Sequence, residues 1–183
     1  MNREVTNLVN AEEIVDNDRS HVWHHIVQHK PMKEGAPMVI VEGEGLRVRD
    51  INGKEYLDAV SGGVWTVNVG YGRESIANAV RDQLAQMCYF ANSAGNIPGA
   101  KFANKLIEKM PGLSRVYFSN SGSEANEKGF KLVRQLAALK NDGKKHKIIY
   151  RDRDYHGTTI TALSSCGQEQ RKEQYGPFSL DQL

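Results

Sequence analysis

Small hydroxyl residues and a glycine gather in the segment 119–127, which reads SNSGSEANE. The segment lies between a short apolar run and a long amphipathic one, so it joins an expected strand to an expected helix. The first backbone amides of a helix have no partner within the helix, and the helix dipole favours an anion there. Gly122 lets the backbone approach a phosphate closely, and Ser121 and Ser123 add hydroxyl donors. The segment therefore has the chemistry of a phosphate-binding loop.

The same residues also suit an ordinary helix N-terminus. Ser121 or Ser123 is a favourable N-cap, and Glu124 or Glu127 favours the first turn. Taken alone, the cap is the more common of the two interpretations. The glycine-to-Gly-Lys-Ser/Thr spacing of a P-loop is missing, and so is the Gly-x-Gly-x-x-Gly fingerprint of dinucleotide-binding folds. A nicotinamide-dependent dehydrogenase is therefore not expected.

A second group of candidate residues lies in the segment 154–159, which reads DYHGTT. Tyr155 offers a flat aromatic surface for stacking on a heteroaromatic ring, although a half-buried loop tyrosine is equally consistent with the sequence. His156 by itself is more typical of a structural hydrogen-bonding residue than of a base. Taken together, a phosphate cradle and an aromatic plate at neighbouring strand ends predict a site for a flat phosphorylated ring.

The elements around these two segments alternate between helix and strand. Apolar residues recur every three or four positions in the helical stretches, whereas the strands are short continuous apolar runs. This alternation predicts an open, largely parallel α/β sheet, in which ligands bind at the C-terminal ends of the strands. The expected helices span 74–87, 98–110, 124–140 and 158–163, and the expected strands span 116–118 and 148–150.

The first third of the chain has a different pattern. Residues 1–20 are expected to form a polar arm, and residues 21–28 a short helix that ends at Pro31. Residues 38–58 show strand character, and Asn52-Gly53 is a strong hairpin-turn signal. The expected division is a small unit of arm and β-hairpin, 1–60, followed by the first part of a larger α/β domain, 61–183.

These motifs have a familiar combination. The segments 119–127 and 155–157 closely resemble the pattern of the class III (omega) aminotransferases, which have fold type I of the pyridoxal-phosphate enzymes. The segments 61–65, SGGVW, and 70–72, GYG, match the same family, and the resemblance extends over nearly the whole chain, from about residue 23 to 178. The chain thus resembles an incomplete fold type I transferase, comprising the arm, the small β unit and the first part of the large, mainly parallel α/β domain.

The resemblance implies a binding site for pyridoxal 5'-phosphate. Gly122 and Ser123, with help from Ser121, would hold the cofactor phosphate. Tyr155 would stack on the pyridine ring, with His156 beside it.

Trp65 would line the substrate pocket near the dimer interface of the family, although the residues alone favour a core aromatic after a β unit. Segment 23–25, Trp-His-His, resembles a family segment at the active-site entrance, but His25 stands where proline is usual. The role of that segment is therefore not carried over.

The resemblance also implies an activity. Segments 21–25, 64–72 and 87–90 look like members of the family that transfer the amino group of taurine, or another ω-amino compound, to pyruvate, giving sulfoacetaldehyde and alanine. In the family, the Schiff-base lysine is expected beyond residue 183, as are the aspartate that pairs with the pyridine nitrogen and the arginine that binds the keto acid. No catalytic residue is therefore assigned, and the chain alone is expected to be inactive. Four lysines of the chain could be considered as replacements for the Schiff-base lysine, but all are expected to be solvated: Lys54, Lys128, Lys131 and Lys140.

An alternative is a non-catalytic module that binds a phosphorylated ligand or a full-length partner through the dimer surface. His21, His25 and His29 lie four residues apart and would share a helical face, but no carboxylate or cysteine completes a metal-binding set, so no metal is expected.

Composition excludes several other functions. With 24 basic and 22 acidic residues, the net charge of +2 gives no basic surface for nucleic acid. Two cysteines, Cys88 and Cys166, cannot form a disulfide framework and indicate a reduced, intracellular setting. No signal peptide and no membrane-spanning stretch is recognised, so the expected location is cytoplasmic.

Overall fold

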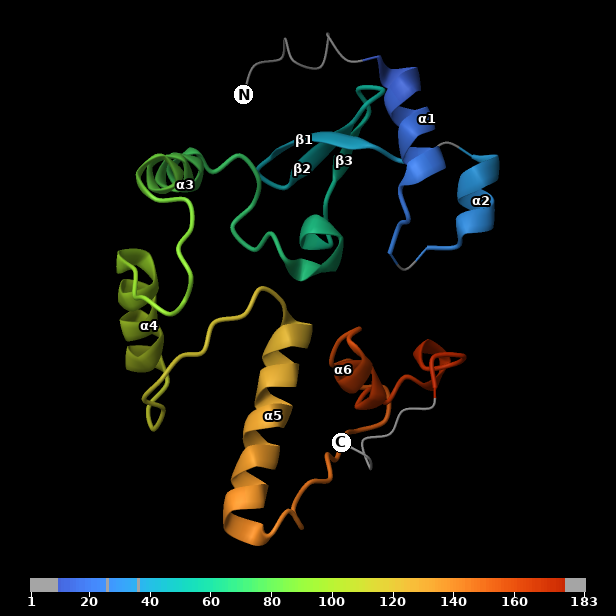
Figure 1. Cartoon of the computed structure of the whole chain (residues 1–183). Helices are drawn as coiled ribbons and strands as arrows, with labels where there is room; N and C mark the ends of the chain where they lie inside the picture. The colour runs from blue at the N-terminus through green and yellow to red at the C-terminus, as the bar shows by residue number, and fades with distance from the viewer. Residues whose placement is uncertain (1–9, 26, 36, 177–183) are drawn as a thin grey trace. The chain divides into compact units, whose positions relative to one another are not determined.

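The computed structural model describes residues 10–25, 27–35 and 37–176 (Figure 1). The chain divides into two compact units between Ala94 and Gly95, and each is described by itself. The domain division expected at residue 60 stays a prediction. The first unit contains α1 (Ala11–His21), α2 (His29–Glu34), β1 (Ile40–Glu44), β2 (Arg47–Asp50), β3 (Glu55–Leu57), the one-turn segment η2 (Ser61–Trp65) and α3 (Glu74–Gln86). The second contains α4 (Ile97–Lys109), α5 (Gly122–Asn141), α6 (Ile160–Ser164) and the short helix η3 (Glu169–Arg171).

Three antiparallel strands in the order β1-β2-β3 form the sheet of the first unit. Between β2 and β3 the chain turns through Asn52 and Gly53, and Gly53 has a φ of 83° that only glycine adopts without strain. The hairpin predicted from Asn52-Gly53 is therefore confirmed.

The buried side chain of Asp50 holds this hairpin from within. Its Oδ1 accepts hydrogen bonds from the amides of Asn52 and Lys54, at 3.0 and 2.9 Å, and its Oδ2 accepts one from the hydroxyl of Tyr56 at 2.8 Å. Burial opposes ionisation, yet the hydrogen bonds from Tyr56 and the two amides hold the pKa of the Asp50 carboxyl below its usual range. The turn is thus fixed by one carboxylate over six residues of chain.

Two helices occupy the region where an arm and a single helix were expected. Helix α1 begins after Asn10, whose side chain accepts the amide of Glu13 at 3.4 Å and so caps the first turn. Helix α2 includes Pro31 in its own first turn, where a missing N–H costs nothing because that amide has no partner in the helix. The helix expected over 21–28 is therefore wrong, since this proline begins a helix rather than ending one. Residues 1–9 of the expected arm lie outside the described residues.

Segment η2 follows the sheet and carries Trp65. Asp58 holds it through Oδ2, which accepts the amide of Gly62 and the hydroxyl of Tyr71, both at 2.6 Å, while its Oδ1 accepts the amide of Val60 at 3.1 Å. The hydrogen bond from Tyr71 is the main cause that lowers the pKa of the Asp58 carboxyl. These contacts are called the Asp58 tie below.

Three predicted helices are confirmed as α3, α4 and α5, with ends within a few residues of the expected positions. Pro98 lies in the first turn of α4, as expected, and the Asn96 side chain accepts the amide of Gly99 at 2.8 Å. Helix α5 ends at Asp142, which adopts the left-handed conformation usual after a helix. Within the described residues, none of the helices is both long and apolar enough to cross a membrane.

The two strands expected at 116–118 and 148–150 are not formed among the described residues. A strand needs a neighbouring strand to pair its backbone groups, and the sheet that the structure describes contains only β1, β2 and β3. Ile149 is 95% exposed, so the apolar run that suggested a buried strand has no cover here. The helix expected after the second of these segments is present as α6.

Candidate cofactor-binding site

The N-terminus of α5 is closed by a reciprocal pair of caps. The Ser121 Oγ accepts the amide of Glu124 at 3.2 Å, and the Glu124 carboxylate accepts the amide of Asn120 at 2.9 Å. This is the capping-box arrangement, and it assigns the cap to Ser121 rather than to Ser123. The ordinary interpretation of this segment is therefore correct as far as it goes.

The cap leaves two donors unused. Among the described residues, no acceptor is recorded for the amides of Gly122 and Ser123, which lie at the positive end of a 20-residue helix. A Cβ added at Gly122 would meet no atom within 4 Å, so the space in front of this backbone is open. The enclosed hydroxyl oxygen of Ser119, just before the loop, likewise has no partner in the described part of the chain. Unpaired donors and open space at one helix end fit an anionic group such as a phosphate.

The second loop lies directly against this helix end. The Ser123 Oγ accepts the amide of Thr158 at 3.1 Å. Gly157 is buried, with a φ of 138°, and a Cβ added there would collide with the Ser123 hydroxyl. Because the Ser123 oxygen acts here as an acceptor, its hydrogen remains available for donation. The expected proximity of the two segments is confirmed, whereas the role of their residues in binding a cofactor stays a prediction.

Tyr155 presents an aromatic ring that is covered by a cation. The side chain is 49% exposed, and the guanidinium carbon of Arg171, in η3, lies 5.3 Å from the ring centroid. A cation over one face of a tyrosine ring is attracted by its π electrons. About half of the residue's surface is accessible, which is compatible with both the stacking role and the half-buried loop tyrosine considered from sequence.

His156 is held mainly through its backbone. Its amide donates to the Cys166 Sγ at 3.1 Å and its carbonyl accepts from the Asn126 Nδ2 at 2.5 Å, while its Nε2 lies 3.7 Å from the Asp154 carboxylate. The hydrogen bonds from Arg151 are the main cause that lowers the pKa of Asp154, so this residue is a carboxylate at neutral pH. The interpretation of His156 as a structural hydrogen-bonding residue fits these contacts.

Trp65 belongs to the first unit. Its side chain is 75% exposed, and its backbone has a φ of 43°, which is unusual for a residue other than glycine. This exposure contradicts, for the described part of the chain, the core position that the residues alone favoured. Its role in a substrate pocket stays a prediction.

Sequence reasoning missed three residues that bind the second loop, namely Asn126, Glu127 and Cys166. The first two were interpreted only as members of a helix terminus. Their contacts with the loop span about 30 residues, and the sequence gives no signal for such pairing. Cys166 lies in a run of small residues and is fully buried.

The lysines divide into two groups. Lys54, Lys131 and Lys140 are exposed, as expected. Lys128 is only partly exposed, because its Nζ donates to the carbonyl of Phe118 at 2.5 Å and lies 4.2 Å from the centroid of the Tyr117 ring. The expectation of a solvated Lys128 is therefore wrong, because its amine is bound to the segment before α5.

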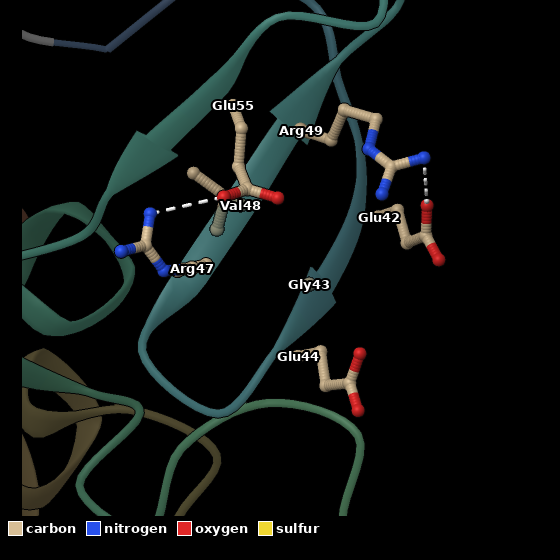
Figure 2. A pocket seen from close by; sticks show the side chains of 7 residues that line it. All are labelled: Glu42, Gly43, Glu44, Arg47, Val48, Arg49 and Glu55. Atoms are coloured by element: carbon tan, nitrogen blue, oxygen red, sulfur yellow. Dashed lines mark hydrogen bonds and ion pairs between the residues drawn. The ribbon is translucent and has the colours of Figure 1, made fainter.

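A pocket on the sheet of the first unit is lined mostly by charged side chains, four of which form two ion pairs (Figure 2). Arg47 bonds Glu55 at 2.9 Å and Arg49 bonds Glu42 at 3.3 Å. Such exposed pairs neutralise the surface and suit a solvated sheet face. Groups of three or more side chains able to hold a metal are absent from the described residues, so the histidine triad is not assembled.

Comparison with known families gives one clear match. The family described as aminotransferase class-III matches residues 29–183. The hypotaurine/taurine–pyruvate aminotransferase of Paracoccus denitrificans is 66% identical over 165 residues, which cover 90% of this chain and 36% of that protein. The taurine–pyruvate aminotransferase of Bilophila wadsworthia is 64% identical over 167 residues, covering 91% and 36%.

Solved structures agree. An aminotransferase of Bacillus anthracis matches with a TM-score of 0.85 and 41% identity over 98% of this chain and 38% of its own. An (S)-enantioselective omega-transaminase of Thermomicrobium roseum matches with a TM-score of 0.86 and 36% identity over 92% and 38%. The chain therefore has part of the fold of these transaminases, as the resemblance implied, and it spans little more than a third of the length of such relatives.

Proposed function

The chain belongs to the class III aminotransferases, and from this premise we propose that it forms the cofactor-holding part of an enzyme that moves an amino group from taurine, or another ω-amino compound, to pyruvate. The products would be sulfoacetaldehyde and alanine. Two relatives with more than 60% identity carry taurine and pyruvate in their names, which supports this choice of substrates.

One observation carries the cofactor assignment. The open amides at the start of α5 and the loop that bears Tyr155 are joined directly, by the bond from the Thr158 amide to the Ser123 hydroxyl at 3.1 Å. A ligand with an anionic group at one end and a flat ring at the other matches this arrangement. Pyridoxal phosphate has that form, and when bound it supplies an electron sink for the carbon that carries the amine.

The residues of this chain would have distinct tasks in that site. The amides of Gly122 and Ser123 would bind the phosphate, with the hydroxyls of Ser121 and Ser123 as further donors. The ring of Tyr155 would lie on the pyridine ring and exclude water from one face. His156 would lie beside the ring, fixed by its backbone bonds, and Trp65 would contribute to the substrate pocket.

We further propose a homodimer as the working assembly, because the resemblance that places Trp65 at the pocket also places it near the dimer interface. Within the second unit, Lys128 is bound to the Phe118 carbonyl, and Lys131 and Lys140 are exposed. We therefore expect the chain by itself not to convert taurine and pyruvate, and steady alanine formation by the purified chain would contradict that expectation.

A binding titration tests the cofactor assignment. The purified chain is titrated with pyridoxal phosphate and with pyridoxal, and binding heat is recorded. We expect saturable binding of pyridoxal phosphate at least about tenfold tighter than that of pyridoxal, since charge-assisted hydrogen bonds to the phosphate would be lost. Tyr155→Ala is expected to weaken the binding of pyridoxal phosphate but not that of inorganic phosphate. Equal affinity for the two cofactor forms would refute the phosphate site.

A further inference from the structure

The carboxylate of Glu127 bridges two parts of the second unit that lie far apart in sequence. Its Oε1 accepts the hydroxyl of Thr159 at 2.5 Å and the amide of Ala162 at 3.1 Å. Ala162 is fully buried, and its amide is one of the first in α6. Glu127 thus supplies from α5 an acceptor for the start of α6.

That acceptor is needed because α6 lacks a cap of its own. Its N-cap residue, Thr159, makes no side-chain hydrogen bond to the α6 backbone, and the helix has only five residues. Initial amides without a partner destabilise a helix end, especially when they are buried. Burial opposes ionisation of Glu127, but the hydrogen bonds from Thr159 and Thr161 and from the Ala162 amide lower its pKa, so the acceptor is charged at neutral pH.

Glu127 does not act alone on this loop. From the first two turns of α5, Ser123 accepts the Thr158 amide at 3.1 Å and Asn126 donates to the His156 carbonyl at 2.5 Å. With Glu127, these residues bind the loop at successive positions along the chain. The set of Ser123, Asn126 and Glu127 is called the α5 clamp. Ser123 and Asn126 grip the loop at and before Thr158, whereas Glu127 grips it after Thr158, where the chain enters α6.

We propose that Glu127 is a positioning residue that fixes the loop 155–159 against the N-terminus of α5, so that the anion-binding amides and the Tyr155 ring act as one site. The proposal rests on the proposed function, because it assigns to this contact the relative placement of phosphate and ring. Glu127 would touch neither of them. Its effect would be on their spacing.

This role predicts a separation between two affinities. Inorganic phosphate needs only the α5 amides, whereas pyridoxal phosphate needs the amides and the ring at a fixed distance. In the purified chain, Glu127→Ala should weaken the binding of pyridoxal phosphate about tenfold, since a charged acceptor is lost, and change that of inorganic phosphate less than about twofold. Glu127→Gln keeps an acceptor oxygen of the same reach, so it should recover part of the loss.

Hydrogen exchange followed by mass spectrometry gives a second measurement that does not depend on a ligand. Glu127→Ala should speed the exchange of residues 155–162 about tenfold while leaving α4 unchanged. Thr159→Val removes one of the two donors and should give a smaller effect on the same peptides. Glu108→Gln, an exposed glutamate on α4 that binds Asn104, is the matched control and should change neither measurement.

The two measurements separate the possible failures. If the unaltered chain does not bind pyridoxal phosphate, the proposed function fails, while the exchange of residues 155–162 still decides whether Glu127 positions the loop. Equal loss of affinity for phosphate and pyridoxal phosphate, or faster exchange throughout the second unit, would make Glu127 a general stabilising residue and overturn the proposal. Unchanged exchange in Glu127→Ala would also overturn it.

Discussion

Each unit of the chain has a glycine-containing loop held by one carboxylate, but the two carboxylates reach very different distances along the chain. In the first unit, the Asp58 tie joins residues two, four and thirteen positions away. In the second, the bonds of Glu127 join residues 32 and 35 positions away. The hydrogen bonds that each carboxylate accepts lower its pKa, so both groups are charged and have similar chemistry. They differ in the sequence separation that their hydrogen bonds span.

The difference shows what each loop requires. A contact within a few residues costs little chain entropy and forms with its own turn, whereas closing a loop of more than 30 residues costs more and gains only when both ends are already ordered. The η2 turn with Trp65 is therefore specified locally. The proposed cofactor site depends on the packing of α5 against α6.

The largest effect is expected when a methyl group is added at Gly157. Gly157→Ala places a Cβ against the Ser123 hydroxyl in a strained backbone conformation, and we expect it to destabilise the second unit by about 1–3 kcal/mol. Gly63→Ala in η2 is the matched control, because Gly63 also has a positive φ but an added Cβ meets no atom within 4 Å. That control should cost only about 1 kcal/mol. Peptide-resolved hydrogen exchange measures both, and equal costs would contradict the close apposition of loop and helix.

A pH titration distinguishes the two carboxylates next. The hydrogen bond from Tyr71 lowers the pKa of Asp58. Burial raises the pKa of Glu127, but the hydrogen bonds that its carboxylate accepts outweigh burial and lower it. The stability that they give is present above the unfolded pKa values of about 4 and is lost as pH falls through the lower folded values. We therefore expect the protection of both loops, which is the exchange rate relative to the intrinsic rate at the same pH, to fall below about pH 4.

At alkaline pH the loops should part company. The hydrogen bond to Asp58 raises the pKa of Tyr71, so its contribution is complete below the ordinary tyrosine value of about 10 and is lost as pH rises through the folded value. Thr159 has no such titration. Relative to the intrinsic exchange rate at each pH, protection should fall in η2 alone, and Tyr71→Phe should abolish this fall. A parallel fall in residues 155–162 would count against the distinction.

Asn126→Ala tests a neutral member of the α5 clamp. It removes the hydrogen bond to the His156 carbonyl and should destabilise the loop by about 1 kcal/mol, or about fivefold in exchange rate. Asn104→Ala removes a comparable hydrogen bond, donated by a side-chain amide on the exposed surface of α4, and should have almost no effect. A larger effect at Asn104 than at Asn126 would show that the clamp adds nothing to ordinary surface bonding.

The smallest expected effect concerns the cation over Tyr155. Arg171→Ala should lower the affinity for pyridoxal phosphate about twofold to fivefold, because exposed cation–π contacts contribute about 0.5–1 kcal/mol. Arg153→Gln, in a side chain that is 91% exposed near the same loop, is the control and should leave the affinity unchanged. An increase in affinity in Arg171→Ala would mean that the arginine occupies the face on which a ligand ring would lie.

Features set by residues close together in sequence could be predicted from the sequence, whereas contacts between residues far apart could not. The Asn52-Gly53 hairpin and Pro98 at the start of α4 are set by neighbouring residues, and both were predicted. The cap of α5 is also local, but the sequence left it open between Ser121 and Ser123. The proximity of the two loops was expected only because both segments were placed at strand ends, and those strands are not formed in the described chain. Glu127 could not be assigned, since a glutamate in a first turn already has a sufficient local explanation.

Pro31 shows a local failure as well. A proline is compatible with either end of a helix, and the choice depends on whether the residues before it or after it have a cap and a packing partner. Here the residues after it are helical. The sequence signal was correct in marking a boundary and wrong in its direction.

The two cysteines differ in accessibility, so their rates of reaction with a thiol reagent can be compared within one chain. Cys88, in the first unit, is exposed, whereas Cys166 lies completely buried under the loop with its Sγ against the His156 amide. A thiol reagent should therefore modify Cys88 at once and Cys166 only at the rate at which the loop lifts from α5. The ratio of the two labelling rates would report the opening of the proposed site in a single sample, without a ligand or a substitution.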